Sequence, residues 1–249
     1  MQSPLPASFA VICFRMSIPD NLASIRERIN EAATRTGKNP ADVKLMAVSK
    51  TFPAEAIRQA YEAGQRLFGE NRVQEFAGKT ESLRDLAGLE MHLIGHLQSN
   101  KSRKAAELFA AIDSVDSLKL AERLNTSAME LGKRLPVLIE INIGGEDVKA
   151  GVALDSAKLE DLLASASRFT NLQICGLMTV PPFTDDPEGA RPFFRRLREL
   201  RDQIAARNLP GINMDELSMG MSHDFEVAIE EGSTCVRIGT AIFGARDYL

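Results

Sequence analysis

Eight short, mostly apolar runs alternate with amphipathic helical patterns from about residue 43 to the end of the chain. The runs lie at about 43–49, 66–69, 90–95, 110–115, 136–142, 172–178, 215–219 and 235–238. Runs such as 136–142, which is apolar at most positions, are typical of parallel strands covered by helices. Because strand and helix patterns alternate strictly, the sequence predicts a fold of the α/β class.

Helical patterns fill the intervals between the runs, and one extra helix precedes them, beginning near Pro19 and ending near Gly37. Eight strand–helix units over about 210 residues predict a single (β/α)8 TIM barrel with an added N-terminal helix. An open doubly wound sheet is the alternative, but the glycine fingerprint of dinucleotide-binding folds is missing after the first run. Apolar residues recur at helical spacing, as in Leu22, Ile25, Ile29 and Ala32; Ala56, Ala60 and Ala63; Leu118, Ala121, Leu124 and Ala128; and Phe193, Leu197, Leu200 and Ile204.

The composition excludes some classes of partner. The chain has 249 residues and a net charge of −4, and without a long basic block we expect no nucleic-acid partner. The apolar stretch 7–14 is too short to cross a bilayer, so no membrane association is expected. Cys13, Cys175 and Cys235 lack disulfide or metal spacing, which favours a reduced, cytoplasmic protein. We predict a disordered extension over 1–15, one domain over 16–249, and a monomer, because no strongly apolar exposed stripe is evident.

Polar residues gather where the predicted strands end, and Lys50 is the most informative of them. Active sites of (β/α)8 barrels lie at the carboxyl ends of the strands. Lys50 directly follows the run 43–49, where partial desolvation favours the neutral amine that attacks an aldehyde carbon. Lys50 is therefore a candidate imine former, and the alternative is a surface lysine at a strand end.

The loops after the last two predicted strands form a candidate phosphate site. Barrel enzymes often bind phosphate there, through backbone N–H groups of small residues. Segment 218–222 supplies Ser218 and a glycine, and the segment after the last strand supplies Gly239 and Thr240. Together with Lys50, these loops indicate an aldehyde cofactor that carries a phosphate.

Arg237 lies within the last predicted strand, where an unpaired charge is costly. It either forms a buried ion pair, with Glu140 or Glu216, or faces a ligand. A guanidinium donates hydrogen bonds and does not deprotonate, so a pyridine nitrogen that faces it would stay unprotonated.

The histidines do not indicate a metal centre. His92, His96 and His223 lack the spacing of metal ligands, so we predict no metal site. His92 lies inside a predicted strand and is expected to be a hydrogen-bonded core residue. His96 is a candidate for the mouth of the barrel.

Six segments carry a family resemblance, in order along the chain. They are 47–51 (AVSKT), 68–75 (FGENRVQE), 92–101 (HLIGHLQSNK), 176–178 (GLM), 218–224 (SMGMSHD) and 237–244 (RIGTAIFG). The chain resembles the YggS/PROSC family of pyridoxal phosphate homeostasis proteins from about residue 18 to the C-terminus. One departure is Arg72, which stands where the family commonly has tyrosine.

The resemblance implies a barrel like the N-terminal domain of alanine racemase that binds pyridoxal 5'-phosphate (PLP) as a Schiff base. By motif position it implies that Lys50 is the Schiff-base lysine and Asn71 lies beside the ring. It further implies that Ser218, Gly239 and Thr240 hold the phosphate, and that Arg237 faces the pyridine nitrogen. Family members are thought to deliver PLP, so apo forms of PLP-dependent enzymes are expected partners.

Three functions fit these residues. The first is a PLP carrier for intracellular PLP homeostasis with little or no turnover and no catalytic residue. The second is a PLP-dependent amino-acid racemase, which needs a second acid–base group besides lysine; Tyr61 and Tyr248 are the chain's tyrosines, and His96 is the other candidate. The third is a Schiff-base aldolase without cofactor, for which Lys149 would compete with Lys50. The carrier is favoured, because a second base is not evident and an aldolase would leave Arg237 without a task.

Overall fold

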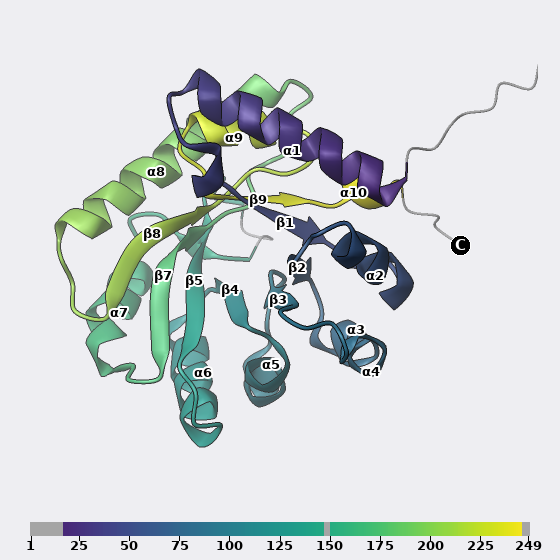
Figure 1. Cartoon of the computed structure of the whole chain (residues 1–249). Coiled ribbons are helices and arrows are strands. Elements are labelled where there is room, and N and C mark those ends of the chain that lie inside the picture. Colours follow the sequence, from purple (N-terminus) through teal and green to yellow (C-terminus); the bar gives the residue numbers. More distant parts are fainter. Residues whose placement is uncertain (1–16, 147–149, 246–249) are drawn as a thin grey trace, which may run out of the picture.

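Eight parallel strands close into a barrel in the computed structural model, which describes residues 17–146 and 150–245. Around the ring they are β1 (Lys44–Val48), β2 (Leu67–Glu70), β3 (Glu90–Leu93), β4 (Ala111–Val115), β5 (Leu135–Asn142), β7 (Leu172–Met178), β8 (Ile212–Ser218) and β9 (Cys235–Ile238). The ring is complete because β1 pairs with both β2 and β9, and β4 pairs with β5 (Figure 1). The predicted (β/α)8 barrel is confirmed, and the open sheet is wrong.

Helices surround this ring on the outside, as Figure 1 shows. They are α1 (Ile18–Arg35), α2 (Ala54–Glu62), α3 (Val73–Ala77), α4 (Thr80–Leu83), α5 (Ser102–Leu108), α6 (Leu118–Glu130), α7 (Ala157–Ser165), α8 (Arg191–Ala206), α9 (Phe225–Glu230) and α10 (Thr240–Phe243). A further strand, β6 (Val152–Ala153), pairs with the end of β5 and has no counterpart in the sequence prediction.

Alternation along β5 shows how the strands divide their residues between two environments. Val137, Ile139 and Ile141 belong to the main apolar core between strands and helices. Successive side chains of a strand point to opposite faces, so Leu138 and Glu140 face the inside of the barrel. Leu138 is buried there, and Glu140 lines a cavity at the barrel mouth. The predominantly apolar strand β5 therefore also contributes a polar side chain, that of Glu140, to the inside of the barrel.

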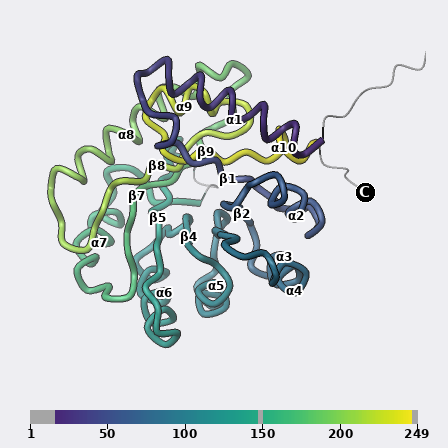
Figure 2. The backbone as a smooth tube through the Cα atoms, viewed as in Figure 1, coloured from purple at the N-terminus to yellow at the C-terminus, as the bar shows by residue number. Residues whose placement is uncertain are grey.

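Helix α1 is the predicted extra N-terminal helix. Ser17 caps it, because its hydroxyl accepts from the backbone N of Asp20 while the Asp20 carboxylate accepts from the backbone N of Ser17. The helix packs on α9 and α10, so the two ends of the described chain lie side by side (Figure 2). The Arg28–Glu226 ion pair at 3.0 Å and a hydrogen bond from Asn21 to the Ile242 carbonyl join them.

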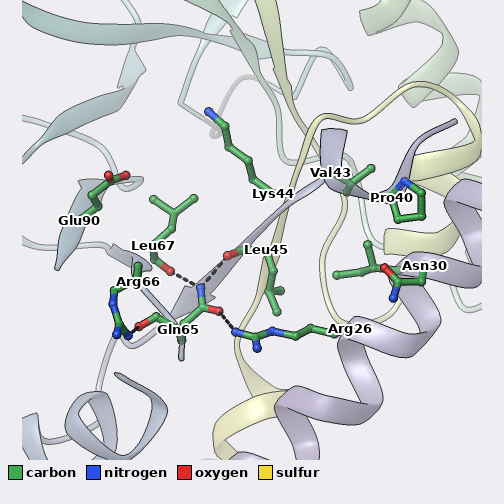
Figure 3. Close-up of a pocket in the computed structure, with 11 residues that line it drawn as sticks. Arg26, Asn30, Pro40, Val43, Lys44, Leu45, Gln65, Arg66, Leu67 and Glu90 are labelled. Carbon is green, nitrogen blue, oxygen red and sulfur yellow. Dashed lines mark hydrogen bonds between the residues drawn. The ribbon is translucent and has the colours of Figure 1, made fainter. Parts of the chain in front are cut away.

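Gln65 ties α1 to the amino ends of two strands. Its amide nitrogen donates to the carbonyl oxygens of Leu45 and Leu67, each at 2.7 Å, and its amide oxygen accepts from Arg26 at 3.2 Å (Figure 3). These residues line a cavity of about 470 Å³ between α1 and the starts of β1, β2 and β3. This cavity lies at the end of the barrel opposite Lys50, where residues of a (β/α)8 barrel usually serve stability.

Several predictions concern residues outside the described ranges. The extension 1–15, Lys149 and Tyr248 are among them. Within the described ranges, no helix is both long enough and apolar enough to cross a membrane.

Candidate functional site

A cavity of about 420 Å³ opens at the carboxyl ends of the barrel strands. This volume lies within the roughly 300–1,000 Å³ that is common for small-molecule sites. The predicted residues Lys50, Asn71, Arg237, Gly239 and Thr240 line it. The other lining residues are Val48, Phe52, Ile94, Gly95, His96, Glu140, Val180, Met221, Ser222 and His223. Ser218 is not among the lining residues.

Lys50 stands on a turn that a buried network holds in place. The hydroxyl of neighbouring Ser49 donates to Glu70 Oε1 at 2.8 Å, and Ser49 is fully buried. The Lys79 ammonium lies between Glu70 and Glu75, at 2.7 and 2.9 Å from their carboxylates. Burial raises the pKa of Glu70, whereas hydrogen bonding to Lys79 lowers it. Glu70 and Glu75 of the 68–75 segment therefore help to hold the turn that carries Lys50.

The residue after Lys50 has an unusual backbone conformation. Thr51 has a φ of +69°, which is uncommon for a β-branched residue. Its backbone N–H donates to Glu75, the same carboxylate that contacts Lys79. The sharp turn that places Lys50 at the cavity is thus fixed by a carboxylate from the β2–α3 region.

Asn71 and His96 form the neighbouring wall of the cavity. A Cβ atom on Gly95 would lie 2.4 Å from the Asn71 carbonyl oxygen, so a glycine is required for these two loops to meet. His96 Nδ1 lies 2.9 Å from the Asp116 carboxylate. His96 lines the cavity, as the sequence suggested, and His92 is hydrogen-bonded to Asp113 at 3.1 Å as expected. The side chain of Arg72 is exposed and does not line the cavity.

Arg237 is 3% exposed and reaches the cavity from β9. Its guanidinium donates to Ser218 Oγ at 2.7 Å and to the Thr179 carbonyl oxygen at 2.6 Å. Within the described structure no ion pair joins it to Glu140 or Glu216, so the buried ion pair considered from the sequence is wrong. Burial lowers its pKa. The Ser218 hydroxyl and the Thr179 carbonyl, both neutral acceptors, therefore orient a positively charged guanidinium that lines the cavity.

The two predicted phosphate loops lie together at the cavity. Met221, Ser222, Gly239 and Thr240 all line it, and Ser222 Oγ accepts from the backbone N of Ala241. Gly220, with a φ of +95°, has no room for a Cβ, which would meet Ala228 at 2.6 Å. The structure therefore places the hydroxyl of Ser222 beside Gly239 and Thr240, whereas the Ser218 hydroxyl is buried behind them against Arg237.

Glu140 is the lining residue whose role the sequence did not reveal. It is 8% exposed, and burial raises its pKa from 4.5 to about 7. Nearby Asp116 adds to this rise, whereas Arg237 and His96 oppose it. A glutamate inside the apolar run 136–142 was the available signal. In the described ranges, no group of three or more His, Cys, Asp or Glu side chains is arranged to hold a metal ion.

Comparison with known proteins places this chain in a family. The family model for the alanine racemase N-terminal domain matches residues 21–247. The pyridoxal phosphate homeostasis protein of Escherichia coli (strain K12) is 47% identical over 233 residues, covering 93% of this chain and 97% of the relative. The chain belongs to the family of pyridoxal phosphate homeostasis proteins. The Aquifex aeolicus (strain VF5) homeostasis protein is 45% identical, covering 94% of this chain and 100% of its own length.

Solved structures agree with the family assignment. PipY of Synechococcus elongatus PCC7942, solved with PLP bound, is 42% identical and aligns with a TM-score of 0.80 over 92% of this chain and 100% of PipY. Alanine racemase from Clostridium difficile 630 aligns with a TM-score of 0.68 at 16% identity, and this chain covers 57% of that enzyme. The second likeness shows a shared fold. The barrel of this homeostasis-family protein is thus the alanine racemase N-terminal type.

Proposed function

We propose that this protein binds PLP in the cavity at the carboxyl end of the barrel and serves PLP homeostasis. The observation that carries the proposal is the convergence of Lys50, Arg237 and the Gly239–Thr240 loop on one cavity of suitable size. PipY, which shares 42% of its sequence with this chain over its full length, has been solved with PLP bound.

The residues around the cavity suit the parts of this cofactor. The Lys50 amine lies at a strand end, where it would hold the cofactor covalently through its aldehyde group. The backbone around Gly239 and Thr240, with the hydroxyl of Ser222, suits the phosphate. Arg237 donates hydrogen bonds, so it would leave a pyridine nitrogen that faces it unprotonated. Ser218 would act indirectly, by orienting Arg237.

An unprotonated ring nitrogen makes the cofactor a poor electron sink, which favours storage over turnover. We infer a carrier that holds PLP with little or no catalysis and delivers it to apo forms of PLP-dependent enzymes. We also propose that the carrier acts as a monomer in the cytoplasm.

Titration of the apoprotein with PLP, followed by visible absorption, tests the proposal. The wild-type protein should become yellow with one PLP per chain. The Lys50→Ala variant should stay folded by circular dichroism and bind PLP without the imine absorption band. Lys44→Ala is the matched control, because Lys44 begins the same strand at the opposite end and pairs with Glu216. Equal spectra for Lys50→Ala and wild type would refute the assignment.

A PLP-dependent racemase is the second candidate, and one observation favours it. His96 lines the same cavity as Lys50 and is oriented by Asp116, which is the arrangement of a general base held by a carboxylate. Tyr61 does not serve, because its hydroxyl donates to the Ala87 carbonyl oxygen on the outside of the barrel. Incubating the holoprotein with single L-amino acids decides between the two: rapid formation of the D-enantiomer, abolished in His96→Ala, would establish the racemase.

A further inference from the structure

Glu140 lines the candidate PLP cavity and has one unsatisfied carboxyl oxygen. Its Oε2 atom is buried and has no hydrogen-bond partner in the described part of the chain. Glu140 is 8% exposed and reaches the cavity from the carboxyl half of β5. A buried polar atom without a partner loses its hydrogen bond to water and gains none in return. On a residue that lines a ligand cavity, a carboxyl group without a full set of partners indicates a partner on the ligand.

Arg237 does not form an ion pair with Glu140. Arg237 lies close enough to influence the carboxyl group electrostatically, yet its guanidinium donates to Ser218 and Thr179. Asp116, on the loop after β4, carries the same charge as an ionised Glu140 and disfavours its ionisation. Burial acts in the same direction and is the largest cause. Burial and Asp116 therefore favour the protonated form of Glu140.

We propose that Glu140 contacts the bound pyridoxal ring as a hydrogen-bond donor through its carboxyl group. This inference rests on the proposed function. The ring offers an acceptor in its phenolic oxygen, because the pyridine nitrogen has one lone pair and is proposed to face Arg237. A protonated carboxyl group donates one hydrogen bond, whereas a carboxylate donates none. An ionised Glu140 would in addition repel the anionic phosphate and phenolate of the ligand.

The sign of the pH effect follows from this role. As pH rises through about 7 Glu140 loses its proton, so the ligand loses a donor and the affinity falls. Other titratable or charged groups around the cavity act on the same ligand, and their contribution has to be separated from that of Glu140. They are Lys50 after β1, His96 after β3, Asp116 after β4, His223 after β8 and Arg237 on β9.

A ligand without an aldehyde isolates the contribution of Glu140. The probe is 4'-deoxypyridoxine 5'-phosphate, which keeps the ring and phosphate and forms no bond with Lys50. Its Kd is measured by isothermal titration calorimetry at pH 6.5 and pH 8.5. Between these values the wild-type Kd should weaken by about tenfold more than that of Glu140→Gln, because the Gln amide donates at both pH values.

Two further variants control for folding and for charge. Glu140→Leu removes the donor while keeping an apolar side chain, and should bind about tenfold more weakly than wild type at pH 6.5. Glu216→Gln is the matched control, because Glu216 also has an unsatisfied buried oxygen but does not line the cavity. It should keep the wild-type pH dependence.

Two results would overturn the inference in different ways. Equal pH dependence in wild type and Glu140→Gln, with tight binding by both, would reject the role of Glu140 and leave the proposed function intact. Absence of binding by every protein at both pH values would reject the proposed function and this inference together.

Discussion

Neighbouring residues hold the turn on which Lys50 stands. Ser49, Glu70, Glu75 and Lys79 form the buried network that fixes its turn. Because Glu70 is fully buried and Lys79 is 12% exposed, the ion pair between them is far less screened than a surface pair. The residues that matter for the lysine therefore include several that never touch the cavity.

We predict that Lys79→Met will destabilise the protein by about 3 kcal/mol, because it leaves the buried Glu70 charge uncompensated. Chemical denaturation followed by circular dichroism measures this change. The double variant Glu70→Gln/Lys79→Met should recover part of the loss, since it removes the orphaned charge as well. If the single and double variants are equally destabilised, the loss arises from packing and not from the ion pair.

At the scale of elements, the eight strands and the extra helix follow from sequence because their apolar periodicity is strong. The start of β8 does not follow from the sequence, because two polar residues interrupt the apolar pattern there. They are Asn213 and Asp215, whose side chains form a hydrogen bond with each other at the exposed end of the strand. Strand β6 has two residues, too few for any period to show. In α8 only the first residue of the predicted stripe differs: Phe194 is fully buried, whereas Phe193 is partly exposed.

The candidate site shows the same division between local and non-local information. Lys50, Gly239 and Thr240 follow strand ends, so their arrival at one cavity follows from the fold class. Ser222 lines the cavity instead of the predicted Ser218 because of the loop conformation around Gly220, which the sequence pattern does not define. Glu140 reaches the cavity because its side chain points to the inside of the closed barrel, near the carboxyl end of β5. This position depends on closure of the whole ring and not on the sequence around Glu140 alone.

The contact between α1 and the strands gives a prediction for an element. Gln65→Ala removes two donated hydrogen bonds and one accepted one at a residue that is 4% exposed. We expect a loss of about 2 kcal/mol in the free energy of unfolding, because the Leu45 and Leu67 carbonyl oxygens lose their donor. Gln59→Ala, on an exposed position of α2, is the matched control and should change stability by less than about 0.5 kcal/mol. Equal effects would show that Gln65 does not hold α1.

For the whole molecule, the pH dependence of stability reports on the buried carboxyl group of Glu140. Its pKa is raised from 4.5 to about 7 on folding, so between these values the folded state binds more protons than the unfolded state. The free energy of unfolding therefore falls as pH rises through this window, by up to about 3 kcal/mol, because each pKa unit is worth about 1.4 kcal/mol.

We predict that Glu140→Gln will remove this part of the pH dependence in the apoprotein. Relative to wild type, its stability should be higher at pH 8 than at pH 5, as measured by denaturant unfolding at both values. His92, whose pKa is raised by Asp113 against the effect of burial, titrates in both proteins and cancels in the comparison. A variant that follows the wild-type profile would show that Glu140 ionises normally.

Covalent attachment of PLP to Lys50 is the central claim, and mass spectrometry of the reduced protein tests it most directly. The full chain is saturated with PLP, treated with borohydride, digested and mapped. We predict a phosphopyridoxyl group on Lys50, with Lys44 and Lys79 unmodified. An adduct confined to another lysine, or no adduct after saturation, would contradict the account.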